Sequence, residues 1–199
     1  MSSIVISGDT SGAVTLAAPA VAGTNTLTLQ AATATNAVNK LETALAYNWN
    51  GLTTNTSLDF TSLPSWIKKI TVMFNGVSLS STAQILVQLG DSGGIESTSY
   101  VSSSAQARDA LASIGGTSTA GFLIYQGSGG GNNATGIMTI CLISGTTWIS
   151  SHSASNTAAS SGISGGGTKT LSDTLTQIRI TSTSTDTFDA GSVNLLLEG

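Results

Sequence analysis

The stretch Gly136-Ile-Met-Thr-Ile-Cys-Leu-Ile143 decides the fold class, because it is apolar on both faces of an extended chain. Successive side chains of a strand point to opposite faces of the sheet. One face would therefore carry Ile137, Thr139, Cys141 and Ile143, and the other Met138, Ile140 and Leu142. Such a strand is expected at the centre of a sheet or covered on both faces. Cys141, the only cysteine, is expected to be a small buried hydrophobe rather than a nucleophile.

From residue 50 onwards the chain reads as a series of short strands separated by turns rich in Gly, Ser and Asn. Strands are expected at 58–61, 67–74, 83–89, 97–102, 121–125, 136–143, 147–151, 175–181 and 192–197. Helix signals are nearly absent there, apart from a possible turn at 105–112. This pattern predicts a mainly β fold, with an antiparallel, jelly-roll-like sandwich over residues 50–199. The bulky side chains expected in or beside its core are Trp66, Phe74, Phe122 and Trp148.

Residues 1–35 form a different kind of segment, with no aromatic residue and one charge, Asp9. Strand-like pieces at 3–7, 13–16 and 26–29 alternate with Gly and Pro. Their side chains are too small and sparse for one chain to bury much. We expect copies of this segment to intertwine, because their backbone edges can pair with each other. The side chains expected at this contact are Val14, Leu16, Leu27 and Leu29.

Residues 36–49 are expected to form a short helical neck. Asn36 suits a helix N-cap, and Val38, Leu41 and Leu45 fall on one helical face. A helix of about three turns is not stable alone in water. It either docks on the following domain or is a neck where several copies meet through that apolar stripe.

Composition excludes several classes of protein. Only 8% of the 199 residues are charged, whereas 31 are Ser and 30 are Thr, so hydroxyl groups must supply most of the polar surface. Six Lys and Arg in the whole chain do not make the basic surface of a nucleic-acid binder. No apolar run is long enough for a membrane span. Because the start of the chain has no secretory signal, synthesis in the cytoplasm and a fold without disulfides are expected.

Side chains that carry chemistry are scarce. His152 is the only histidine and Cys141 the only cysteine, so neither a catalytic triad nor a zinc site is expected. No catalytic residue, cofactor or metal is predicted, and the chain is interpreted as a protein that is not an enzyme.

Binding is instead expected on loops, where a rigid sandwich usually carries it. Loops 90–96, 126–134 and 152–167 are the candidates. Tyr100 and Tyr125 could stack on a sugar ring or simply pack against the fold. Asn132, Asn133 and His152 complete the set of candidate receptor-binding residues.

Several longer segments of the sequence resemble segments found in one protein family. At the N-terminus they are Ile6-Ser-Gly-Asp-Thr-Ser-Gly-Ala-Val-Thr-Leu16 and Ala18-Pro-Ala-Val-Ala-Gly-Thr-Asn-Thr-Leu-Thr-Leu29. Further along they are Asp59-Phe-Thr-Ser-Leu-Pro-Ser-Trp-Ile-Lys-Lys-Ile-Thr-Val-Met-Phe-Asn-Gly-Val-Ser78, Gln84-Ile-Leu-Val-Gln-Leu-Gly-Asp-Ser-Gly-Gly-Ile-Glu96, Leu175-Thr-Gln-Ile-Arg-Ile-Thr181 and Phe188-Asp-Ala-Gly-Ser-Val-Asn-Leu195. The chain resembles tail-fibre and other virion structural proteins of tailed bacteriophages over most of its length. Gln30 departs from the usual Pro of that family.

The resemblance implies a virion component made in the host bacterial cytoplasm, usually a homotrimer. Its N-terminal part would attach to other virion proteins, and its C-terminal β-rich head would contact a host-surface glycan or protein. A capsid-decorating head fibre or a tail connector with a purely structural role is the alternative. A depolymerising spike would need paired acids in a groove, which the few acidic residues do not favour.

Overall fold

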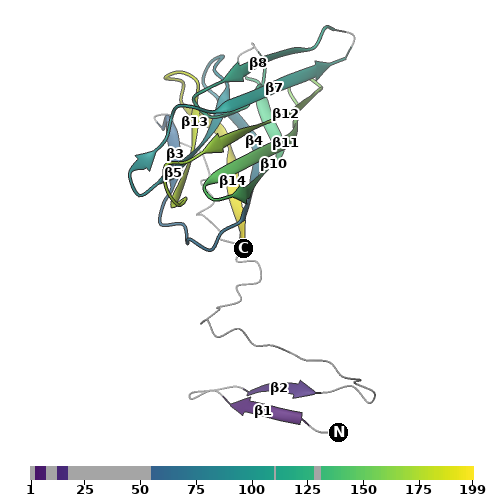
Figure 1. Cartoon of the computed structure of the whole chain (residues 1–199). Helices are drawn as coiled ribbons and strands as arrows, with labels where there is room; N and C mark the ends of the chain where they lie inside the picture. Colours follow the sequence, from purple (N-terminus) through teal and green to yellow (C-terminus); the bar gives the residue numbers. More distant parts are fainter. Residues whose placement is uncertain (1–2, 8–12, 18–54, 110, 128–130) are drawn as a thin grey trace. The chain divides into compact units, whose positions relative to one another are not determined.

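The computed structural model describes residues 3–7, 13–17, 55–109, 111–127 and 131–199 (Figure 1). The chain divides into two compact units, Met1–Asn36 and Ala37–Gly199. In the first unit, β1 (Ser3–Ser7) and β2 (Ala13–Ala17) form an antiparallel hairpin in which Ser3 lies opposite Ala17. Val14 and Leu16 lie on β2, and the intertwining of copies stays a prediction. The expected helix 36–47, with Val38, Leu41 and Leu45, lies outside the described residues, as do Leu27 and Leu29.

The second unit, here called the head, contains a larger and a smaller antiparallel sheet. The larger sheet consists of β4 (Lys69–Leu79), β7 (Val101–Arg108), β8 (Ile114–Ser118), β10 (Asn133–Ser144), β11 (Thr147–Asn156), β12 (Ser161–Thr170) and β14 (Phe188–Glu198). In space their order is β14–β4–β10–β11–β12–β7–β8 (Figure 1). Thus β10 lies between β4 and β11, and its predicted central position is confirmed.

The smaller sheet consists of β3 (Ser57–Phe60), β5 (Ile85–Asp91), β6 (Gly94–Ile95), β9 (Phe122–Ile124) and β13 (Gln177–Ser182). Strand β5 pairs with β13 on one edge, and on its other edge with β9 at one end and β6 at the other. All seven residues of β5 are buried, as expected for a strand at the centre of this sheet.

One apolar core lies between the two sheets and accounts for the fold. The larger sheet contributes Ile70 and Val72 from β4 and Met138 and Ile140 from β10, all at 0% exposure. The alternation along these strands places their neighbours on the opposite face. The predicted mainly β sandwich is confirmed. Phe74, Phe122 and Trp148 are buried, and Trp66 packs half-buried against the core, so their predicted placement is also confirmed.

Three strands were not predicted, and a fourth is displaced. The two-residue β6, the Gly-containing β8 and β12 lie outside the predicted strands, and β6 and most of β12 fall in stretches interpreted as loops, 90–96 and 152–167. Strand β12 includes Gly165, Gly166 and Gly167, which looked like a flexible loop. Strand β7 covers 101–108, not 97–102, and it takes in the first half of the stretch interpreted as a turn at 105–112.

The two ends of the sandwich can be told apart by the chain's path. The chain leads into β3 at one end, where Asn55 O accepts a hydrogen bond of 3.0 Å from Phe188 N; this is the Asn55 end. At the other end the chain stops beside β4, where Lys68 N donates to Glu198 O at 2.8 Å; this is the Gly199 end, where Figure 1 marks the C-terminus. Loops 80–84, 157–160 and 183–187 and the residues Gly127, Gly131 and Asn132 lie at the Asn55 end. Loops 92–100, 145–146 and 171–176 lie at the Gly199 end.

Candidate binding surfaces

The face of the larger sheet that points away from the core is its outer face. Cross-strand pairing brings its residues into rows; one row runs from Glu198 through Lys69, Cys141, Ile149 and Thr168 to Val101. Further positions of the outer face are Asn194, Leu196, Thr71, Met73, Ile137, Thr139, Ile143, Ser151, Ser153, Ser155, Gly162, Ser164, Gly166, Ser103, Ala105, Ala107, Gly115, Thr117 and Asp189. The charged residues among them are Asp189, which accepts a hydrogen bond from Ser78, and Lys69 and Glu198, which pair with each other at 2.8 Å.

Large apolar side chains are exposed on this face. Ile137 is 50% exposed, Ile143 62%, Ile149 43% and Val101 70%. Cys141, expected to be buried, is half-exposed beside Ile149, because β10 has a core only on its other side. Exposed apolar groups that gather in one place are typical of a protein–protein contact.

Two strands of the outer face depart from the usual pattern of burial. On β7 the buried positions are the polar Ser102, Ser104 and Gln106, while Val101 and Ala105 are exposed. On β11 the pattern is mixed: Trp148 is buried together with Ser150 and His152, and Ile149 is exposed together with Ser151 and Ser153. In an isolated soluble domain the apolar residues of a strand normally face the core, so Val101 and Ile149 depart from the usual pattern.

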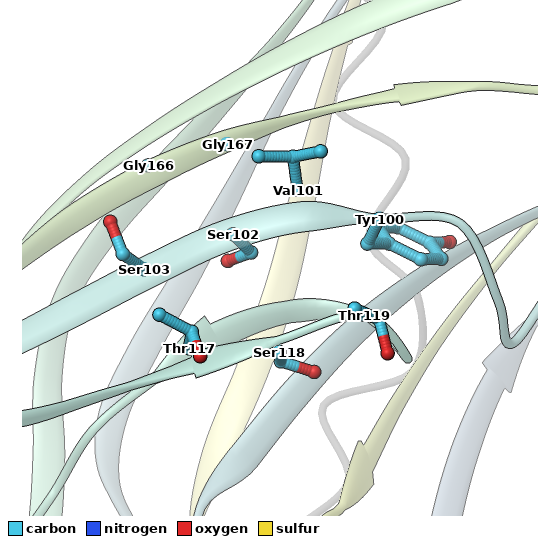
Figure 2. A pocket seen from close by; sticks show the side chains of 9 residues that line it. All are labelled: Tyr100, Val101, Ser102, Ser103, Thr117, Ser118, Thr119, Gly166 and Gly167. Carbon is cyan, nitrogen blue, oxygen red and sulfur yellow. The ribbon is translucent and has the colours of Figure 1, made fainter.

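A hollow of about 360 Å³ opens where β12, β7 and β8 meet (Figure 2). The glycines of β12 leave it without side chains along one side, and Val101 and Ser103 stand on β7 as Figure 2 shows. Its lining is uncharged: Tyr100, Val101, Ser102, Ser103, Thr117, Ser118, Thr119, Gly166 and Gly167. The hollow therefore offers hydroxyl groups and one aliphatic side chain, without a charged group to fix an ionic ligand.

Tyr100, a candidate for sugar stacking, is part of the core, with 1% exposure. Its hydroxyl accepts a hydrogen bond from Leu89 N at 2.7 Å and donates one to Glu96 O at 3.1 Å. Its ring meets Phe122 edge-on, with 5.1 Å between centroids. Burial raises the pKa of this phenol. The stacking hypothesis is wrong for Tyr100, because a loop-flanking aromatic was needed to fill the end of the core.

His152 also differs from its expected place in a loop. It lies on β11, faces the core and is 7% exposed. Its Nε2 is 3.0 Å from Ser104 Oγ, and its Nδ1 has no hydrogen-bond partner. Burial lowers the pKa of His152 to about 4, which keeps the ring neutral near pH 7. The candidate loop 152–167 is thus mainly β11 and β12 joined by a short turn, and that expectation is wrong.

The remaining candidates gather at the Asn55 end. Asn133 begins β10, and its Oδ1 accepts hydrogen bonds from Thr157 N at 3.0 Å and Thr157 Oγ1 at 2.8 Å. Asn132 and Tyr125 are half-buried nearby, and the Tyr125 ring lies beside Gly116 of β8. Asn133 therefore fastens the β11–β12 turn to the start of β10, and the structure separates this group from Tyr100 and His152.

At the Gly199 end, a buried charge network was not found by sequence reasoning. Lys169 on β12 is 3% exposed, and its Nζ is 2.5 Å from Glu96 Oε2 and 2.9 Å from Thr98 O. The hydroxyl of Ser172 donates to Asp91 Oδ2 at 2.6 Å, and Ser172 N donates to Glu96 Oε1 at 2.7 Å. This network fastens loops 92–100 and 171–176 to each other.

Hydrogen bonds set the charge of this network. The hydrogen bond from Ser172 lowers the pKa of Asp91. Burial alone would raise the pKa of Glu96, but the hydrogen bonds from Lys169 and Ser172 lower it overall. Both carboxylates are therefore ionised near pH 7, and that of Glu96 pairs with the buried Lys169. A lysine in Gly-Gly-Gly-Thr-Lys-Thr gives no sequence signal of such a role, because its partners are far along the chain.

Two further searches of the structure concern ions and membranes. Over the described ranges, no group of three or more His, Cys, Asp or Glu side chains could hold a metal ion. The same part of the chain contains no helix long and apolar enough to cross a membrane.

Comparison of the chain with protein-family models, with curated proteins and with solved structures found no match.

Proposed function

We propose that the chain is a virion structural protein of the tailed-phage fibre type. Its N-terminal unit would attach it to other virion proteins, and the head would be displayed for contact with the host surface. Two observations support this. Sequence segments that resemble those of phage fibre proteins occur in both units. The chain is also divided into a short N-terminal unit and a β-sandwich head. Copies would act together as a homotrimer, so that several weak head contacts add up.

The observation that carries the proposal is that Asn55, the first described residue of the head, and the fastened loops lie at opposite ends of the sandwich. At the Gly199 end the network around Lys169 joins loops 92–100 and 171–176 through an ion pair and hydrogen bonds. A loop that is ordered before it binds loses less entropy on binding. These loops present exposed polar residues, among them Ser97, Thr98 and Thr174, and they are the host-contact surface we favour.

A capsid-decorating fibre or a tail connector is the second candidate, and the exposed isoleucines of the outer face favour it. In the part of the head that the structure describes, no Phe, Tyr or Trp side chain is exposed. Aromatic anchors are common where a surface binds its partner strongly. The outer face of the head would then contact other virion proteins, and the head would need no strong binding site for a host receptor.

Electron microscopy tests the proposal. Antibody raised against the purified chain would be applied to particles of the phage whose genome carries the sequence. Label on the tail supports a tail fibre, and label on the capsid supports the decorating alternative. Absence of the chain from purified particles by mass spectrometry would overturn both.

Variant particles then test the host-contact surface. Ser97→Arg with Thr174→Arg at the Gly199 end should slow adsorption to host cells. Ala158→Arg, an exposed position at the Asn55 end, is the matched control and should leave adsorption unchanged. Equal adsorption of both variants would contradict the assignment of the Gly199 end.

A further inference from the structure

We propose that copies of this chain pack on one another through the outer face of the larger sheet. The isoleucine half of one head, formed by Ile137, Ile143 and Ile149, would seat against the hollow half of the next, formed by the hollow on β12, β7 and β8. This inference deepens the proposed homotrimer, on which it rests, by assigning the surface through which its heads meet.

The burial pattern of two strands is the first argument. On β7 the chain places polar side chains inside and Val101 outside, at 70% exposure. On β11 it buries Ser150 and His152 beside Trp148 and leaves Ile149 43% exposed. Removing apolar surface from water is favourable in proportion to its area. A partner that covers the outer face would bury Val101 and Ile149, which the head alone leaves exposed to water. Local rules tend to fail in this way where a surface has a further role.

The low charge of the outer face permits contact between two copies of the chain. The chain has a net charge of −4, so two copies repel each other over most approaches. Besides the mutually paired Lys69 and Glu198, the outer face carries one charged residue, the exposed Asp189 near the start of β14, so contact there brings few like charges together. A strongly basic or acidic partner would find little opposite charge on this face, and charge complementarity would not select it.

The two halves of the face differ in relief. The half on β10 and β11 carries three exposed isoleucines, whereas the half on β12, β7 and β8 carries glycine and small side chains around a hollow of about 360 Å³. A large side chain of one copy can therefore fill the hollow of another. Contact between two different patches is head-to-tail, and such contacts close into rings when the rotation permits. This favours a cyclic trimer over a two-fold dimer.

A cross-link in the full chain tests the proposal directly. Cys141, the only native cysteine, lies in the isoleucine half, and Ser103→Cys would place a second thiol in the hollow. Within one chain β11 and β12 separate these strands, so the two positions are about 14 Å apart at three strand spacings. A disulfide needs Cα atoms within roughly 7 Å, so these two cysteines can join only between chains.

On mild oxidation we expect disulfide-linked dimer and trimer of the Ser103→Cys chain on a non-reducing gel, with no longer ladder. Ser57→Cys, a half-buried serine on β3 of the smaller sheet, is the matched control and should cross-link at least tenfold less. Equal cross-linking of the two variants, or none in either, would overturn the inference. The measurement uses the purified chain alone, so its outcome does not depend on whether virions carry the protein.

A second pair of variants distinguishes association through the outer face from non-specific association of the chains. In the Ser103→Cys background, Ile149→Asp should reduce cross-linking at least tenfold, because it places a charge on the apolar half. Leu111→Asp is the control: Leu111 is 63% exposed in the β7–β8 connection, away from the face, and its loss should change nothing. Both variants must show the β-sheet circular dichroism of the parent. Unchanged cross-linking in the Ile149→Asp chain would contradict the proposed packing.

Discussion

His152 and Ser104 meet across a glycine. Both residues are paired with Gly165 of β12, one from β11 and one from β7. The imidazole Nε2 therefore reaches over β12 to lie 3.0 Å from Ser104 Oγ. A Cβ on Gly165 would lie 2.7 Å from His152 Cε1 and 2.7 Å from Ser104 Cα. The side-chain contact between two strands thus depends on the missing side chain of the strand between them.

Gly165→Ala should destabilise the head by about 1–3 kcal/mol, because the added methyl overpacks a filled site. Gly162→Ala on the same strand is the control, since nothing lies within 4 Å of a Cβ there. Urea unfolding of the two full-length variants measures the difference. Equal midpoints would contradict the packing described for His152.

His152 should make the fold sensitive to mild acid. Its pKa is about 4 in the fold against an ordinary value of 6.5, so between these pH values the unfolded chain binds more protons than the folded one. The free energy of unfolding therefore falls as the pH drops from 6.5 towards 4, by about 3 kcal/mol in total. His152→Gln should lower stability near pH 7 and flatten this slope. Denaturant midpoints at several pH values test it, and an unchanged slope in the variant would rule out His152 as the source.

The two Lys–Glu pairs should differ in their contribution. Lys169→Met removes a cation with a 2% exposed side chain from Glu96 and should cost about 2 kcal/mol. This is below the ~3–5 kcal/mol typical of a broken buried pair, because Glu96 keeps Ser172 and some water. Lys69→Met breaks a pair whose lysine side chain is 43% exposed and should change stability little. Thermal unfolding compares the variants, and a larger loss for Lys69→Met would refute the ranking.

Tyr100→Phe should cost about 1–3 kcal/mol, since it leaves the buried Leu89 N–H without the hydroxyl that accepts its 2.7 Å hydrogen bond. Tyr125→Phe, at a half-buried ring, should have a smaller effect. Unfolding free energies of both variants give the comparison. A neutral Tyr100→Phe variant would mean that this hydroxyl is not needed by the core.

The strands with long apolar alternation could be predicted from the sequence. The stretch around Met138 and Ile140 predicted a central strand, and the structure confirms it. The large aromatic residues Phe74, Phe122 and Trp148 were predicted in or beside the core for the same reason: few other positions could bury them.

Strand β12 could not be predicted, because its glycines serve neighbours on other strands. The need for Gly165 comes from His152 and Ser104, which lie 13 and 61 positions away. A glycine-rich loop and a glycine-rich strand look alike until those neighbours are known. Strand β7 was displaced for a related reason, since its buried positions are serines and a glutamine that usually face water.

The candidate binding residues were predicted less well than the fold. Tyr100 and His152 were expected near loops because short polar residues surround them in sequence, yet both belong to the interior. The outer face gave no local signal. Its rows join residues from six strands, and only the register of the sheet brings Ile149 beside Cys141 and in line with Val101.

The central claim is that copies of this chain associate, and the mass of the full chain in solution tests it most directly. Light scattering behind size exclusion, at protein concentrations in the micromolar range, should give three times the mass of one chain. A single-chain mass across that range would contradict both the proposed homotrimer and the packing of its heads through the outer face.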